Sequence, residues 1–106
     1  MCNIKVLHHN EHGHVVQCAN CRQLQIGYGN TIISMGINEF QKFRKVISES
    51  CKDSKDSLSP QVSNITIHTP SQQIKLVFSV QELELLHDLI GQAGIMMEVN
   101  SILSFN

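Results

Sequence analysis

The residues best suited to metal binding or thiol chemistry form the short segment Cys18-Ala19-Asn20-Cys21. Two cysteines separated by two residues can direct both thiolates to one side of a tight turn, where they share a tetrahedral metal ion. Cys2 lies upstream, and four of the chain's six histidines lie between Cys2 and the segment. The spacing therefore indicates a structural zinc site near the N-terminus.

A hairpin across this region would bring the candidate ligands together. Residues 4–8 and 15–17 have the composition of strands, and residues 10–13 are typical of a turn. Cys2 is then expected to return close to the two later cysteines. The predicted zinc ligands are Cys2, Cys18, Cys21, His8 and His9. The identity of the fourth ligand stays open among His8, His9, His12, His14 and Cys51.

Other interpretations of Cys18 and Cys21 stay open. Both can be small buried apolar residues, since cysteine outside disulfides is among the most buried residue types. They can also form the redox pair of a thiol-dependent redox protein or enzyme, although a strand-like segment follows them where a redox pair needs a helix N-terminus. A reversible metal-binding protein that uses the histidines is a further alternative. No nucleophile can be matched with a base and an orienting group, so the sequence favours a protein without enzymatic activity.

The elements that must position this segment form a repeat. Residues 24–47 match residues 67–90 in their apolar pattern at an offset of 43. Each copy predicts two strands joined by a turn and then a helix. Ser79 and Glu82 have the spacing of a capping box, and Gly36 and Glu39 hold the equivalent positions in the first copy. The side chains expected to be buried on the two helices are Ile37, Phe40, Phe43, Val46 and Ile47, then Val80, Leu83, Leu86, Leu89 and Ile90.

These patterns predict a single α+β domain. Its antiparallel sheet is built from two ββα repeats with the helices on one face, and a zinc-ribbon-like hairpin precedes it. The predicted segments are a Cys/His hairpin (1–22), a ββα repeat (23–50), a linker (51–62), a second ββα repeat (63–94) and a helical tail (95–106). The tail is expected to follow a break at Gly91 or Gly94, and its apolar face is expected either to contact a second copy or to pack on its own sheet.

Composition excludes several classes of protein. The 106 residues carry a net charge of −1 and no concentrated basic run, which disfavours nucleic-acid binding. No segment has the length and apolarity of a membrane span, and no export signal is present, so we expect a cytoplasmic protein. In that compartment the four cysteines favour thiols or a bound metal over disulfides.

Three short motifs resemble a family of small uncharacterised proteins, mostly from Bacteroidota. The motifs are Cys18-x-x-Cys21, Leu24-x-Ile26-Gly27-Tyr28-Gly29-Asn30 and Glu39-Phe40-x-x-Phe43, within about the first half of the chain. The resemblance implies a bacterial cytoplasmic protein of unknown function and supplies no catalytic residue. The residue patterns themselves favour a non-enzymatic interaction or regulatory domain, with its N-terminal hairpin either clipped by a structural zinc or simply packed, and with a protein partner or a second copy.

Overall fold

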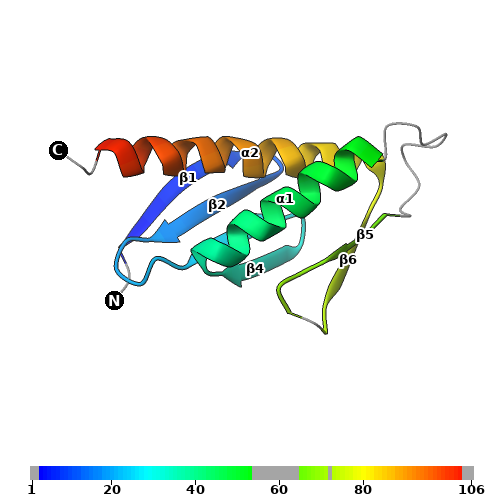
Figure 1. Ribbon diagram of the computed structural model, residues 1–106, viewed down its shortest axis with the longest axis horizontal. Coiled ribbons are helices and arrows are strands. Elements are labelled where there is room, and N and C mark those ends of the chain that lie inside the picture. The colour runs from blue at the N-terminus through cyan, green and yellow to red at the C-terminus, as the bar shows by residue number, and fades with distance from the viewer. Residues whose placement is uncertain (1–2, 54–64, 72, 104–106) are drawn as a thin grey trace.

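A computed structural model describes residues 3–53, 65–71 and 73–103 of the chain (Figure 1). The described elements are β1 (Ile4–Asn10), β2 (Gly13–Cys18), β3 (Leu24–Tyr28), β4 (Thr31–Met35), α1 (Ile37–Asp53), β5 (Ile65–His68), β6 (Lys75–Phe78) and α2 (Val80–Leu103). The predicted α+β class is confirmed.

The main sheet contains β1 to β4, antiparallel and in chain order. Short polar turns join its strands. The Asn10 side chain accepts hydrogen bonds from the backbone N–H groups of His12 (2.8 Å) and Gly13 (3.1 Å), which closes the first turn. Gly29 has a φ of 59°, which glycine adopts without steric cost, and it allows the turn between β3 and β4.

Both helices lie on one side of the main sheet in Figure 1, with α2 along β1 and β2 and with α1 beside α2. Alternate side chains of the strands meet the helices, as the two-residue period of a strand requires. The core consists of Leu7, Val15, Leu24, Ile26, Met35, Phe40, Phe43, Ile47, Ile67, Phe78, Leu83, Leu86, Leu89, Ile90 and Ala93. On the opposite face Val6 and Ile32 are exposed, so no described element covers that side of the sheet.

The two helices begin as the capping pattern predicts. The N–H of Ser79 donates to Glu82 Oε1 (2.8 Å), and the N–H of Glu82 donates to Ser79 Oγ (3.1 Å), so α2 has a complete capping box. Before α1 the N–H of Gly36 donates to Glu39 Oε1 (2.9 Å), which is half of the same motif. The predicted buried residues of α2 are all confirmed, whereas on α1 Val46 is exposed and Ile37 is only half-buried.

The two predicted hairpins do not join into one sheet within the described residues. β5 and β6 form a separate two-stranded sheet, and β2 of the N-terminal hairpin pairs with β3. Val15 and Ile26 are opposite each other in that pairing, and both are fully buried. The N-terminal hairpin is thus part of the main sheet and not a separate ribbon, because its apolar face completes the core.

The C-terminal helix also differs from the prediction. α2 continues through Gly91 and Gly94 without a break. The described part of the predicted tail, residues 95–103, is therefore the C-terminal end of α2 and not a separate helix. Gly94 is buried against Arg44 of α1. A β-carbon at Gly94 would lie 2.5 Å from Arg44 Cζ, so the absence of a side chain leaves room for the arginine. This packing outweighs the low helix propensity of glycine. α1 extends to Asp53, so the predicted linker is helical over its first three residues, and the rest of the linker lies outside the described residues.

Candidate functional site

The knuckle, as we name residues 18–22, is a closed turn between β2 and β3. The N–H of Cys18 donates to the carbonyl of Gln23 (2.9 Å), and the N–H of Arg22 donates to the carbonyl of Cys18 (2.8 Å). The N–H of Ala19 donates to the carbonyl of Asn3 (2.8 Å), which holds the turn against the start of β1. The turn therefore places Cys18 and Cys21 together, as their spacing predicts.

The two sulfur atoms of the knuckle are in different states. Cys18 is buried and disulfide-bonded, whereas Cys21 is exposed and carries a thiol. The N–H of Cys21 lies 3.4 Å from Cys18 Sγ and donates a hydrogen bond to it. The expectation of reduced cysteines is thus correct for Cys21 and for Cys51 but wrong for Cys18.

The predicted histidine ligands lie at the other end of the hairpin. Ile4 pairs with Cys18, whereas His8 pairs with Val15 and His9 pairs with His14. Four residues of strand place His8 roughly 13 Å along β1 from the knuckle. Cys2, the remaining predicted ligand, lies outside the described residues.

The other candidates for the fourth ligand are also dispersed. The ring of His12 lies 3.5 Å from the carboxylate of Glu11 in the first turn, and His14 packs against Gly27 on the outer face of the sheet. Cys51 lies near the end of α1, where its Sγ donates to the carbonyl of Leu83 (3.7 Å). Among the residues with described positions, no three His, Cys, Asp or Glu side chains are grouped as metal ligands.

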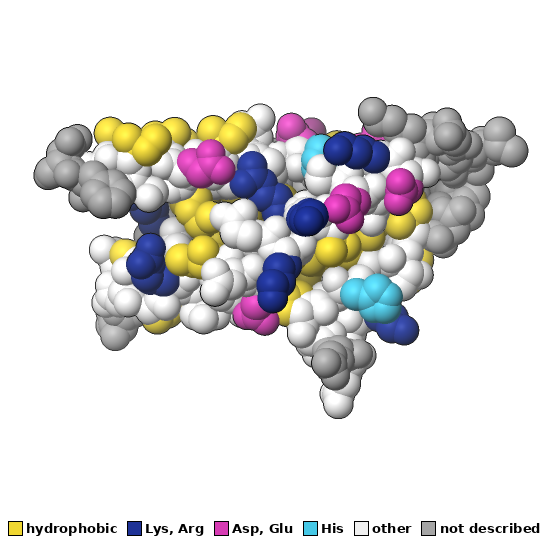
Figure 2. Space-filling view, in the orientation of Figure 1, with side chains coloured by type: hydrophobic (Ala, Val, Ile, Leu, Met, Phe, Trp, Pro, Cys, Tyr) yellow, Lys and Arg dark blue, Asp and Glu magenta, His cyan; other side chains and the backbone are white. Residues whose placement is uncertain are grey.

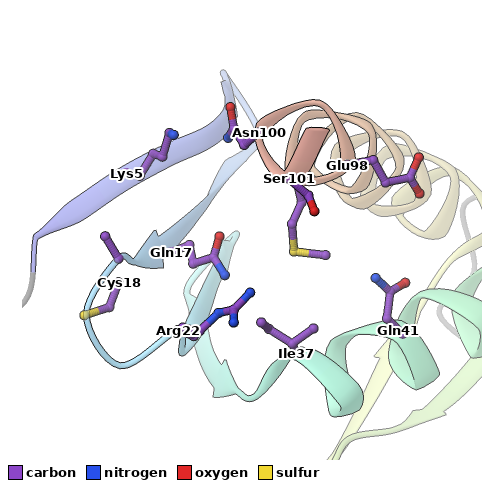
Figure 3. A pocket seen from close by; sticks show the side chains of 11 residues that line it. Lys5, Gln17, Cys18, Arg22, Ile37, Gln41, Glu98, Asn100 and Ser101 are labelled. Atoms are coloured by element: carbon purple, nitrogen blue, oxygen red, sulfur yellow. The ribbon is translucent and has the colours of Figure 1, made fainter. Parts of the chain in front are cut away.

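A cleft opens beside the knuckle, between the ends of β1 and β2, the first turns of α1 and the last turns of α2. It has a volume of about 420 Å³, and we name it the knuckle cleft. Figure 3 shows Arg22 and Gln17 pointing into the space that α1 and α2 bound. Sequence patterns did not indicate this cleft, because its walls come from segments that are far apart in the chain.

A second surface with functional potential runs along the solvent side of α2. Figure 2 shows hydrophobic side chains gathered over the C-terminal half of this helix. Their exposed fractions lie between 41% (Met96) and 70% (Ile102), which is high for large apolar residues. We name this surface the α2 stripe, and it consists of Ile95, Met96, Val99, Ile102 and Leu103.

Comparison with known proteins assigns the chain to a family. A family model described as "Family of unknown function (DUF6686)" matches residues 1–105. No curated protein and no solved structure matches the chain significantly. Among the helices that the structure describes, none combines the length and the apolarity needed to cross a membrane.

Proposed function

Since the chain belongs to the DUF6686 family, whose function is not established, we propose from its surface that it is a non-enzymatic interaction domain that works as a homodimer. The observation that supports this proposal is the exposure of the α2 stripe. Large apolar side chains that are exposed side by side to water raise the free energy of the isolated chain. Burial against a partner surface removes this unfavourable contribution. The C-terminal half of α2 is therefore the expected contact.

The spacing of the α2 stripe favours a second copy as the partner. Its five positions lie at −4, −3, 0, +3 and +4 relative to Val99, so the pattern reads the same in both directions. Two such helices packed antiparallel around a two-fold axis at Val99 would place Ile95 of one copy beside Leu103 of the other. A two-fold axis requires a contact surface that is complementary to itself, whereas contact with a different protein has no such requirement.

The size and charge of the stripe are consistent with pairing. Five side chains with these exposed fractions offer roughly 500 Å² per chain, so a dimer would bury about 1,000 Å², the lower limit for a specific interface. No stripe position carries a charge, so pairing would bury no ion without a partner. We expect a reversible dimer.

Replacement of Val99 by glutamate tests this proposal. Two Val99→Glu side chains would face each other across the axis, and their like charges would oppose association. Sedimentation velocity between about 5 and 500 μM should show a concentration-dependent dimer for the unmodified chain, because interfaces of this size are often transient. We expect the variant to raise the dissociation constant about tenfold or more.

Ile74→Glu is the matched control, because it adds the same charge at an exposed apolar residue between β5 and β6, away from α2. It should leave the dimer unchanged. Circular dichroism should show both variants folded, since both positions are exposed. A chain that stays monomeric over the whole concentration range would contradict the proposal, as would equal dissociation by both substitutions.

A second candidate function, thiol chemistry or zinc binding at the knuckle, is supported by the contact between Cys18 and Cys21. A Cys21 thiolate beside the disulfide-bonded Cys18 could attack its sulfur. The step would form a Cys18–Cys21 disulfide and release the sulfur formerly bonded to Cys18 as a thiolate, without net oxidation. In the reduced chain the same two thiolates would be available to hold zinc with further ligands.

Metal analysis and disulfide mapping separate the two uses of the knuckle. A zinc clip predicts one zinc per chain after purification under reducing conditions, lost in the Cys18→Ser, Cys21→Ser double variant and kept in Cys51→Ser. Thiol exchange predicts no zinc and, once mild oxidation has restored the disulfide of Cys18, its conversion to a Cys18–Cys21 disulfide in peptide mass spectra. A chain with neither zinc nor this disulfide would leave the knuckle as a structural turn.

A further inference from the structure

We propose that the knuckle cleft binds a small organic anion, with its carboxylate or phosphate group held by Arg22 and with Lys5 as a second cation in the cleft wall. Its volume of about 420 Å³ lies within the range of roughly 300–1,000 Å³ that is typical of pockets for small ligands. Its lining combines cations, side-chain amides and an apolar part. The inference goes beyond the proposed dimer, because this cleft and the α2 stripe lie on opposite sides of α2.

The charges of the cleft favour an anion. Lys5 extends from β1 and Arg22 from the knuckle, and neither forms an ion pair with any residue that the structure describes. Glu98 on the opposite wall lies 3.5 Å from Arg44 of α1, so a second cation offsets its charge. The cleft is thus locally positive, although the whole chain has a net charge of −1.

The backbone of Arg22 points to a use for its side chain. Its φ of 62° is in the left-handed region, and it is the one non-glycine residue with a positive φ in the described part of the chain. Glycine or asparagine would close the same turn with less strain. What arginine adds is a guanidinium group with fixed donors, which matches the oxygen atoms of a carboxylate or phosphate.

The rest of the lining suits the body of an organic ligand. Gln17 of β2, Gln41 of α1 and Asn100 of α2 contribute side-chain amides that can donate to oxygen atoms. Ile37 and Met97, both partly buried against the core, provide an apolar surface between the helices. An anion with a short carbon skeleton would contact both parts, whereas a bare inorganic ion would use the cations alone.

Titrations followed by amide NMR spectra test the proposal and distinguish the two oxyanions. The probes are phenyl phosphate with inorganic phosphate, and benzoate with acetate, all at an ionic strength kept constant with sodium chloride. We expect saturable shifts at Lys5, Gln17, Arg22 and Asn100 with at least one phenyl compound. That compound should bind more tightly than its partner without the ring. The pair that binds shows whether the natural ligand carries a phosphate or a carboxylate.

Arg22→Asn is the decisive variant, because asparagine accepts the left-handed backbone and removes the positive charge and the guanidinium donors. It should weaken binding about tenfold, as expected for a lost hydrogen bond to a charged group. Lys75→Gln, which removes an exposed cation from β6, is the matched control and should change the affinity less than about twofold.

Three results would overturn the proposal. The first is the absence of saturable shifts with all four probes. The second is a set of shifts that sodium chloride alone reproduces, which would indicate screening of surface charge. The third is equal weakening by Arg22→Asn and Lys75→Gln, which would mean that net charge, and not this cleft, attracts the anion. None of these results bears on the dimer, which is measured without added ligand.

Discussion

At the scale of single residues, Tyr28 joins the main sheet to the second half of the chain. Its hydroxyl donates a hydrogen bond to the backbone carbonyl of Glu82 (2.7 Å) in the first turn of α2. Its ring meets the ring of Phe78 edge-on at a centroid distance of 5.9 Å. One side chain of β3 therefore contacts both β6 and the capped start of α2.

The environment of Tyr28 predicts a loss of stability at alkaline pH. Burial, and then the negative charge of Glu82, raise the pKa of the phenol above its ordinary value of 10.0. The folded chain therefore holds this proton more tightly than the unfolded chain. The contribution of the protonated Tyr28 hydroxyl to the free energy of unfolding is complete below pH 10.0. It is lost as the pH rises through the pKa of Tyr28 in the folded chain.

Tyr28→Phe isolates this contribution. We expect the variant to lose about 1 kcal/mol near neutral pH, the usual value of one such hydrogen bond, and the difference from the unmodified chain to shrink above pH 10.0. Tyr28 is the single tyrosine and tryptophan is absent, so ultraviolet absorbance reports its ionisation directly. An absorbance midpoint at or below 10.0, or a difference that does not change with pH, would contradict this assignment.

At the scale of elements, the two helices differ in how their first turns are capped. Ser79 and Glu82 satisfy each other's N–H groups, whereas Gly36 offers no side chain to the N–H of Glu39. A β-carbon at Gly36 would have only ordinary contacts, the nearest at 3.5 Å. The position therefore has room for the missing half of a capping box.

Two substitutions should shift stability in opposite directions. Gly36→Ser should complete the box of α1 and raise the free energy of unfolding by about 0.5 kcal/mol, whereas Ser79→Ala should lower it by about 1 kcal/mol. Urea unfolding at a fixed protein concentration measures both. Ser34→Ala, on the exposed face of β4, is the control and should change stability by less than about 0.5 kcal/mol.

The interpretation of the caps would fail in either of two cases. One is a Gly36→Ser chain that is less stable than the unmodified chain. The other is a Ser79→Ala chain that loses no more stability than Ser34→Ala.

The elements themselves were largely predictable from periodicity. Alternation identified the strands, and the apolar spacing identified both helices together with nearly all of their buried positions. The break predicted at Gly91 or Gly94 was wrong because helix propensity is a local quantity, whereas the contact of Gly94 with Arg44 is tertiary. Capping was predictable because its partners lie only three residues apart.

At the scale of the whole molecule, contacts between distant segments were the part that sequence could not supply. The pairing of β2 with β3 decides which hairpin completes the main sheet, and no local pattern encodes that choice. The knuckle was predictable from the spacing of its cysteines. The cleft beside it was not, because Lys5, Arg22 and Asn100 come together only after the helices pack on the sheet.

The last turns of α2 contribute to two surfaces at once. Met97 and Asn100 line the knuckle cleft, while Val99 and Ile102 belong to the α2 stripe on the opposite side of the same helix. If both proposals hold, binding at one surface would restrict the motion of these turns. Binding at the other surface would then lose less conformational entropy. The resulting coupling free energy would be reciprocal, so an anion would favour assembly by the same factor by which assembly favours the anion. The occupancy of the cleft would then depend on how much of the protein the cell contains.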